Sequence, residues 1–314
     1  MDGEYELIKQ ISYLCVNSIS TVFLLYITIC QIVIFIRKRL YRKRLRSVKE
    51  VLKPSNIPLV MNAILIISGI FGISLSACLS AVNVSKVIYW KCFVKFKKEY
   101  MENETEISVI KKCFVNYGDH MTKLFSAGQF FYMFLITFIY MLLWLRQTMF
   151  NTEPTLKRLS SKYLNIFSYF QGCFIILSGV ILGISWMYYL RYADPFTFIF
   201  LSIQLEIQIS VLILFLVPLI KHQRSLKFLY QNPNPPDRLI RLMKRSTAAT
   251  IVAMVTDIAT IVVFQIASEY LMSINALLNM CCVIFCFADW REKFIPCLVL
   301  CTNDKAEAEQ VDAK

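Results

Sequence analysis

The sequence predicts an all-α membrane protein: a seven-transmembrane helix bundle with its N-terminus outside the cell and a short amphipathic eighth helix. Two observations lead to this prediction. Hydrophobic residues make up 57% of the 314 residues, which is too much apolar surface for a water-soluble domain. The Lys and Arg residues, which give a net charge of +13, cluster between apolar runs. That placement is typical of membrane-flanking segments and argues against a nucleic-acid partner.

Seven apolar segments have the length of about 20 residues that a helix needs to cross a bilayer. They are residues 11–36, 57–82, 124–145, 163–190, 195–220, 247–267 and 270–288. The last two belong to one apolar stretch that as a single helix would be about twice as long as the hydrocarbon is thick. We therefore expect the chain to fold back near Ser268, Glu269 and Tyr270. Residues 1–10 form the extracellular N-terminus, residues 11–290 the membrane domain, and residues 291–314 the amphipathic helix and cytoplasmic tail.

The connections between the segments predict the direction of the chain. The first loop, from Arg37 to Lys53, holds nine Lys or Arg residues, and the third and fifth loops are also basic. The short fourth and sixth loops carry only Arg191 between them. Because basic loops stay in the cytoplasm, the odd-numbered loops are expected inside and the N-terminus outside. The expected location is the plasma membrane, with several crossings.

The second loop, residues 83–123, contains lysines mixed with acids, so its charge is a weaker guide. Both N-x-Ser/Thr sequons of the chain, at Asn83 and Asn103, fall in this loop. Such sequons are glycosylated on the lumenal side of the membrane, which supports an external position. Asn103 is the better acceptor, because Asn83 lies very close to the second span.

Four cysteines are candidates for modification. Cys92 and Cys113 lie in the second loop on the predicted oxidising side, where a disulfide between them is one interpretation. The alternative is that residues 89–93 continue the second helix along the interface as an aromatic belt. Cys297 and Cys301 follow the last span on the predicted cytoplasmic side and are candidates for palmitoylation.

The segment after the seventh span has an amphipathic pattern. Phe287, Trp290 and Phe294 recur at three- and four-residue spacing, and charged residues lie between them. This pattern predicts a short helix on the inner membrane surface, followed by a disordered tail.

Polar residues inside the predicted spans mark the candidate site. Asp257 lies near the middle of the sixth span, where an acid costs roughly 2.5–3.5 kcal/mol, so a buried partner is expected. Asn275 and Asn279 share one face of the seventh span, which is expected to point into the bundle. Asp257 is either a ligand contact or part of a switch network, or else a structural hydrogen-bonding group. The two asparagines fit either a switch network or interhelical packing.

Five more polar residues in the middle and outer parts of the spans could line a ligand pocket. They are Gln129, Tyr132, Glu206, Gln265 and Glu269. No span contains a lysine, which excludes a retinal Schiff base. The sequence also lacks metal-ligand spacing, a glycine-rich phosphate loop and a nucleophile elbow. We therefore expect no enzymatic activity, no cofactor and no metal.

The external N-terminus, seven spans, basic inner loops and eighth helix followed by cysteines resemble the G-protein-coupled receptor superfamily. Arg146 stands where the rhodopsin-like family ends its third span with an acid-arginine-tyrosine triplet, and Asn279 matches part of a signature in the seventh span. The other residues of both motifs differ, as in divergent chemoreceptors and orphan receptors. The resemblance implies an unknown extracellular ligand and a heterotrimeric G protein that contacts Arg146, Lys244 and Arg245. Membrane lipid is the remaining expected partner.

Two other functions fit the same residues. In a transporter or channel subunit, Glu206, Asp257 and Glu269 would mark a proton or cation path. The third hypothesis is a structural membrane protein that binds no ligand.

Overall fold

A computed structural model describes residues 2–45, 57–100, 107–152, 162–188, 193–228, 237–264, 271–287 and 290–295. The regular structure in these ranges is entirely helical, which confirms the all-α prediction. The helices are α1 (Asp2–Leu45), α2 (Ile57–Tyr100), α3 (Ile107–Thr152), α5 (Lys162–Tyr188), α6 (Ala193–Phe228), α7 (Asp237–Phe264), α8 (Leu271–Cys286) and α9 (Trp290–Phe294).

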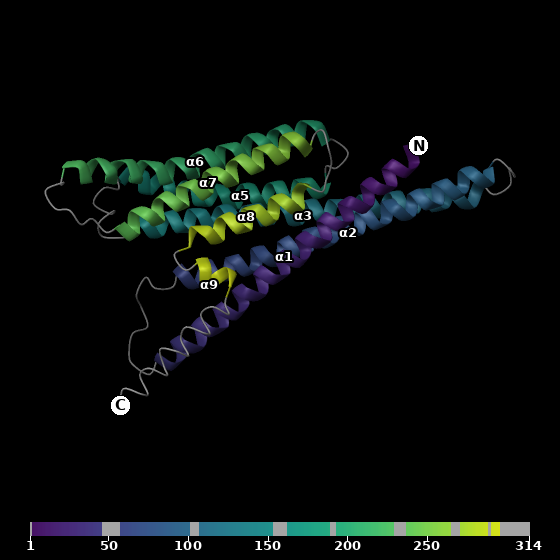
Figure 1. Ribbon diagram of the computed structural model, residues 1–314. Coiled ribbons are helices and arrows are strands. Elements are labelled where there is room, and N and C mark those ends of the chain that lie inside the picture. The colour runs from purple at the N-terminus through teal and green to yellow at the C-terminus, as the bar shows by residue number, and fades with distance from the viewer. Residues whose placement is uncertain are drawn as a thin grey trace, which may run out of the picture.

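Helix α3 is the centre of the bundle. It packs against α2, α5, α6 and α8, and the pairs α1 with α2 and α7 with α8 complete the assembly (Figure 1). Buried apolar side chains of α3, such as Leu135, Ile139 and Leu142, form the middle of the core. The short α9 lies below α8 and contacts α1 (Figure 1).

Four of the described helices are long and apolar enough to cross a membrane. These segments are Leu7–Arg37, Val60–Cys92, Gly118–Thr148 and Lys162–Ser185, and shorter apolar segments lie at Ser202–Leu214 and Leu271–Cys286. Large apolar side chains also cover the outside of α5, where Phe170 is 66% exposed and Leu177 is 61% exposed. A water-soluble protein rarely exposes so much apolar surface, so the fold is that of a membrane protein.

The second loop predicted from the sequence, residues 83–123, is largely helical where the structure describes it. Helices α2 and α3 run past the ends of the expected spans to Tyr100 and Ile107 and project together from the bundle (Figure 1). At about 1.5 Å per residue, α2 is roughly 66 Å long, about twice the thickness of the hydrocarbon. Residues 83–100 contain no Gly or Pro that would end a helix. The backbone thus follows the alternative in which residues 89–93 continue the second helix.

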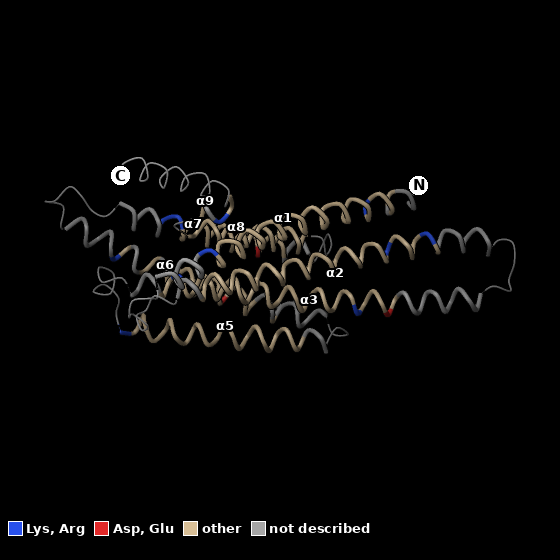
Figure 2. The backbone as a smooth tube through the Cα atoms, turned by 90° about the horizontal axis from the view of Figure 1, so that it is seen from below, with Lys and Arg blue, Asp and Glu red and all other residues tan. Residues whose placement is uncertain are grey.

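Helices α1 and α6 also extend beyond both ends of the apolar segments from which they were predicted, and α7 begins earlier than its segment. Helix α7 begins at Asp237, directly after Pro235 and Pro236, instead of at residue 247. The first turns of α7 are basic. Charged residues form a helix as readily as apolar ones, but the prediction of membrane spans considered only apolar segments and so left these turns out. Among the described residues, Lys and Arg lie toward the ends of the bundle and leave its middle nearly free of positive charge (Figure 2).

Candidate functional site

Asp257 of α7 is completely buried, with 0% exposure, and lies at the meeting point of four helices. Its Oδ1 accepts hydrogen bonds from Asn275 Nδ2 at 2.7 Å and Asn279 Nδ2 at 2.5 Å, both on α8. Its Oδ2 accepts from Gln208 Nε2 of α6 at 2.7 Å and from the hydroxyl of Tyr140 on α3. Two donors on each oxygen use the full acceptor capacity of a carboxylate. We call these five residues the central polar cluster.

Helical spacing brings the cluster together. Asn275 and Asn279 are one turn apart on α8 and are both buried, which confirms that this face points into the bundle. Gln204 and Gln208 stand in the same relation on α6 and are likewise buried. The cluster therefore joins α3, α6, α7 and α8 through one carboxylate.

Further polar contacts extend from the cluster along α3. Asn275 Nδ2 also donates to the hydroxyl of Tyr132 at 2.9 Å, and Gln204 Nε2 donates to the hydroxyl of Tyr140 at 3.2 Å. One further turn along, Gln129 Nε2 lies 3.3 Å from Met272 Sδ. Of the residues predicted to line a pocket, Gln129 and Tyr132 thus lie on one continuous buried strip that leads to Asp257.

Four amide oxygens around the cluster are buried without a hydrogen-bond donor. They are Gln204 Oε1, Gln208 Oε1, Asn275 Oδ1 and Asn279 Oδ1. In all four amides the nitrogen donates to the carboxylate or to a tyrosine hydroxyl, and the oxygen of the same amide accepts no hydrogen bond. Each such acceptor costs about 1–3 kcal/mol if it stays unpaired, so the region favours a hydrogen-bond donor from water or from a ligand.

Glu206 is not part of this site, which corrects the prediction that it lines the pocket. Its side chain is exposed, and Oε1 accepts a hydrogen bond from Ser210 Oγ at 3.3 Å on the same helix. Residue 206 lies two positions from Gln204 and two from Gln208. At about 100° per residue, its side chain is on the opposite side of α6 from both. The predicted pocket residues Gln265 and Glu269 lie outside the described residues.

A second polar group lies at the end of α3 that carries Arg146. Arg146 is only 6% exposed, and its Nε donates to Ser246 Oγ of α7 at 3.1 Å. Its guanidinium group also lies 5.3 Å from the centre of the Phe287 ring. Arg245 Nη2 donates to the main-chain oxygen of Phe287 at 2.6 Å, whereas Lys244 is exposed. Arg146 and Arg245 therefore tie α3 and α7 to the chain that follows α8.

Lys293 of α9 is one of the charged residues between Trp290 and Phe294, and it is only 1% exposed. Its Nζ lies 2.5 Å from Asn62 Oδ1 and 3.4 Å from Gln31 Oε1, and it stands 4.2 Å above the Phe287 ring. Gln31 Nε2 in turn donates to the main-chain oxygen of Lys293 at 3.0 Å. This single side chain connects α9 to α1 and α2. No spacing rule indicated it, because its partners are far away in sequence.

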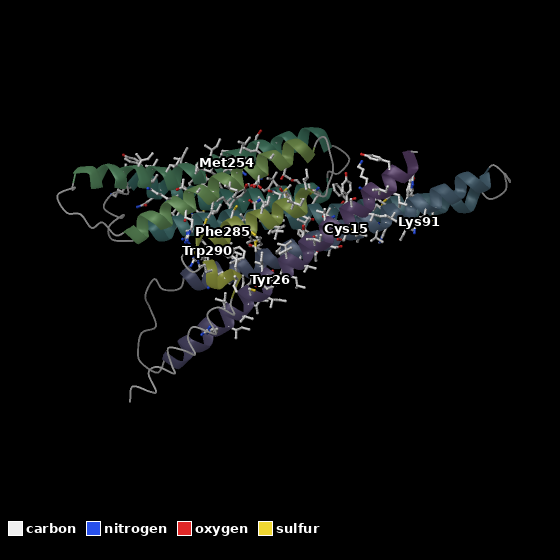
Figure 3. All side chains as sticks on the ribbon, viewed as in Figure 1. Cys15, Tyr26, Lys91, Met254, Phe285 and Trp290 are labelled. Atoms are coloured by element: carbon white, nitrogen blue, oxygen red, sulfur yellow. The ribbon has the colours of Figure 1, made fainter. Side chains whose placement is uncertain are left out.

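Aromatic side chains hold the short α9 in place beside Lys293. Phe285 and Trp290 have ring centres 4.9 Å apart, and the hydroxyl of Tyr26 donates to the main-chain oxygen of Phe294 at 2.8 Å. Figure 3 shows Tyr26, Phe285 and Trp290 around the junction of α1, α8 and α9. The predicted short helix is thus confirmed at Trp290–Phe294, where it packs on the bundle as well as facing outward.

The predicted modification sites remain predictions. Asn83 is 5% exposed within α2, which disfavours a glycan, and Asn103 lies outside the described residues. Cys92 is exposed on α2, and the side chain of Cys113 lies outside the described residues. The palmitoylation candidates Cys297 and Cys301 also lie outside the described residues.

The chemistry available in the described part of the chain is that of hydrogen bonding and charge. Within it, no group of three His, Cys, Asp or Glu side chains is placed to hold a metal ion. Comparison with known proteins gave no matching family model, no matching curated protein and no matching solved structure. The two polar groups, around Asp257 and around Arg146, are therefore the features from which we infer a function.

Proposed function

We propose that this protein is a plasma-membrane receptor with seven membrane-spanning helices that binds an extracellular ligand and signals to a heterotrimeric G protein. The observation that carries the proposal is the connection of α3, α6, α7 and α8 through the one buried carboxylate of Asp257. A buried acid inside a membrane domain is costly and is typically kept for a functional reason. Any ligand that moves one of the four helices changes the contacts of the other three.

The ligand would enter between α3, α6, α7 and α8 at the end that carries Gln129 and Tyr132. Gln129 and Tyr132 would contact it, and Asn275 would pass its effect to Asp257, because Asn275 Nδ2 bonds to both Tyr132 and Asp257. From Tyr132 to Arg146 the distance along α3 is roughly 21 Å, so the signal must travel through packed side chains.

The output would be the movement of α7 away from α3. Arg146 is buried by its contacts with Ser246 and Phe287, so a partner protein can reach it only after those contacts open. Lys244, which is exposed at the start of the same stretch of α7, and Arg245 would join Arg146 in contacting the G protein. This is a two-state equilibrium, and the ligand must bind the two states with different affinities.

The direct test is guanine-nucleotide exchange on a panel of purified G proteins in the presence of the purified chain. We expect the chain to accelerate exchange on at least one G protein and the Arg146→Leu variant to lose that effect. Arg291→Leu is the matched control, because Arg291 is an exposed arginine at the same end. Glycosidase treatment beforehand checks whether Asn103 is external. Lack of exchange on every G protein, combined with an ion flux in vesicles, would support the transporter alternative instead.

Two further measurements test the parts of the proposal. Asp257→Asn should change ligand-dependent signalling at equal surface expression, and unchanged signalling would remove Asp257 from the switch. Spin labels on non-natural amino acids at positions 244 and 291 should report a change in distance when the G protein binds. If the distance between positions 244 and 291 stays the same in every condition that activates signalling, the hypothesis that the protein is a receptor is contradicted.

A further inference from the structure

Glu206 of α6 is an exposed acid in the middle of an apolar stretch. Residues 195–220 contain no other charged side chain, and the nearest charges along the helix are Asp194 and Lys221. At about 1.5 Å per residue, these two charges lie roughly 18 and 22 Å from Glu206. Glu206 is at the depth of Asp257, because a neighbouring residue of α6 bonds to that acid. With α6 across the bilayer, Glu206 therefore faces the hydrocarbon near its middle.

The carboxyl group of Glu206 has few of the contacts that an acid needs at this depth. A carboxylate can accept about four hydrogen bonds, and Asp257 is contacted by donors from four side chains. Among the described residues, Glu206 accepts a hydrogen bond only from Ser210 Oγ, at 3.3 Å on the same helix. Acids inside a membrane domain are costly and are ordinarily paired. Glu206 thus calls for a partner from outside the bundle.

Exposed side chains at three- and four-residue spacing continue the surface around Glu206. They form the outer face of α6, which is made of Ile199, Ser202, Glu206, Ile209, Ile213 and Ile220. Every seventh residue of this face is an isoleucine except for Glu206. This spacing is the pattern with which one long helix packs against another. Helix α6 lies along the upper edge of the bundle in Figure 1, where a further helix can reach it.

A cationic side chain is the strongest partner for Glu206, and this chain does not supply one. A carboxylate and a Lys or Arg attract each other strongly where the dielectric constant is low. None of the seven predicted spans contains a Lys or Arg. In a symmetric oligomer within one membrane, a second copy brings the same residues to the same depth. The cation therefore has to come from a different protein.

We propose that the outer face of α6 binds a membrane-spanning helix of another protein, and that a Lys or Arg near the middle of that helix pairs with Glu206. The isoleucines pack against apolar side chains of the partner helix, and the ion pair fixes its depth and register. This inference rests on the seven-span arrangement of the proposed function. It does not depend on the extracellular ligand or on signalling to a G protein.

The first measurement checks the depth of α6. A fluorescent non-natural amino acid replaces Ile209, next to Glu206 on the outer face, and the full chain is reconstituted in phosphatidylcholine vesicles. We expect lipids with a spin label deep in the acyl chain to quench this residue more strongly than lipids labelled near the headgroup. The opposite order would overturn the proposal together with the seven-span arrangement. A deep position followed by a negative result below would overturn the ion pair alone.

The probe for the partner is a synthetic single-span peptide of leucine and alanine with one lysine at its centre. Its matched control carries norleucine, which is uncharged and of similar length, at the same position. Energy transfer from a dye on the peptide to a dye at position 314 of the full chain measures association in the same vesicles. We expect half-maximal association of the lysine peptide at a roughly 5- to 30-fold lower peptide-to-lipid ratio.

Variants of the chain test whether Glu206 receives the lysine. Glu206→Gln should abolish the preference for the lysine peptide, because the amide has the same shape and no charge. Asp119→Asn is the matched control and should keep the preference, since Asp119 is an exposed acid outside the predicted spans. Glu206→Lys should reverse the preference, so that a peptide with a central glutamate binds better than the lysine peptide. This exchange of charges decides even if Glu206→Gln is poorly folded.

Three results would overturn the proposal. Equal association of the lysine and norleucine peptides would show that Glu206 recruits no cation. Retention of the preference in Glu206→Gln would place the lysine elsewhere on the bundle. Energy transfer between labelled copies of the chain without peptide, lost in Glu206→Gln, would make a second copy the partner.

Discussion

Asn279 of α8 donates a hydrogen bond from Nδ2 to Oδ1 of Asp257 on α7, with a distance of 2.5 Å between the two atoms. Asn275, one turn earlier on α8, donates to the same oxygen. Helices α7 and α8 follow each other in the chain, so this hydrogen bond joins two sequence neighbours. The other two donors to Asp257 come from α3 and α6 and make the same carboxylate a long-range connection.

The first prediction concerns the contribution of Asp257 to stability. Asp257→Ala leaves Tyr140, Gln208, Asn275 and Asn279 without the acceptor that they share. We expect the free energy of unfolding to fall by about 2–4 kcal/mol, because buried donors lose a charged acceptor. Thermal unfolding of the purified protein in detergent measures the change.

Asp119→Ala is the control for that measurement. Asp119 pairs with Lys123 at 2.6 Å, but both side chains are more than half exposed, at 65% and 72%. Exposed pairs contribute at most about 1 kcal/mol, so this variant should melt close to the unmodified protein. Equal melting of the two variants would show that the central polar cluster does not stabilise the bundle.

The second prediction compares two buried tyrosines of α3. The Tyr140 hydroxyl donates to Asp257 and accepts from Gln204 and Gln208, whereas the Tyr132 hydroxyl accepts from Asn275. Tyr140→Phe should therefore cost about 1–3 kcal/mol of unfolding free energy, and Tyr132→Phe about 0.5–1.5 kcal/mol. Both changes remove one oxygen from the same helix, so the difference in melting temperature isolates the extra contacts. A larger loss for Tyr132→Phe would contradict the arrangement of the cluster.

The third prediction concerns the close approach of α5 to α3. A Cβ atom at Gly172 would lie 2.5 Å from Cζ2 of the Trp144 ring, and that ring is held by a hydrogen bond from Nε1 to the main-chain oxygen of Ser168 at 2.6 Å. Gly172→Ala should destabilise the bundle by about 1–3 kcal/mol, because the ring cannot move without losing that bond.

Gly118→Ala is the opposite case, because among the described residues a Cβ built at Gly118 meets nothing within 4 Å beyond its own stretch of helix. Alanine favours a helix over glycine by about 0.5–1 kcal/mol, so this variant should match or exceed the stability of the unmodified chain. Melting curves of the two variants should shift in opposite directions. A neutral Gly172→Ala would mean that α3 and α5 are not packed so closely.

The fourth prediction concerns the attachment of α9. Lys293→Ala removes the contacts with Gln31, Asn62 and the Phe287 ring. We expect the amide hydrogens of residues 290–295 to exchange with deuterium on the order of tenfold faster, which corresponds to about 1.4 kcal/mol of local stability. Hydrogen–deuterium exchange read by mass spectrometry measures this rate.

The control for Lys293 is its neighbour Arg291, which is exposed and lies 5.5 Å from the Trp290 ring. Arg291→Ala should leave the exchange rate within about a factor of three, since an exposed cation–π contact contributes about 0.5–1 kcal/mol. Lys293→Met keeps the length of the side chain and tests whether its charge is needed. If both alanine variants exchange alike, Lys293 does not anchor α9.

The apolar runs and the polar interruptions could be identified from the sequence because they are local properties. The three- and four-residue spacing placed Asn275 and Asn279 on one face of a helix, and the position of Asp257 in an apolar run required a buried partner. Both expectations are met in the structure. Glu206 was misassigned because polarity in a span does not reveal which side of the helix faces the bundle. The packing of α6 against α7 decides that.

The helical and apolar character of the chain, the places where its charges gather, and the need to pair one acid inside the bundle could all be predicted from the sequence. These conclusions follow from composition and helical period, which act over a few neighbouring residues. It took the packed bundle to reveal that Tyr140 and Gln208 share Asp257 with the asparagines, and that Lys293 is buried against α1 and α2. Those contacts join residues that are distant in sequence, so they depend on how whole helices pack, and no local pattern encodes that packing.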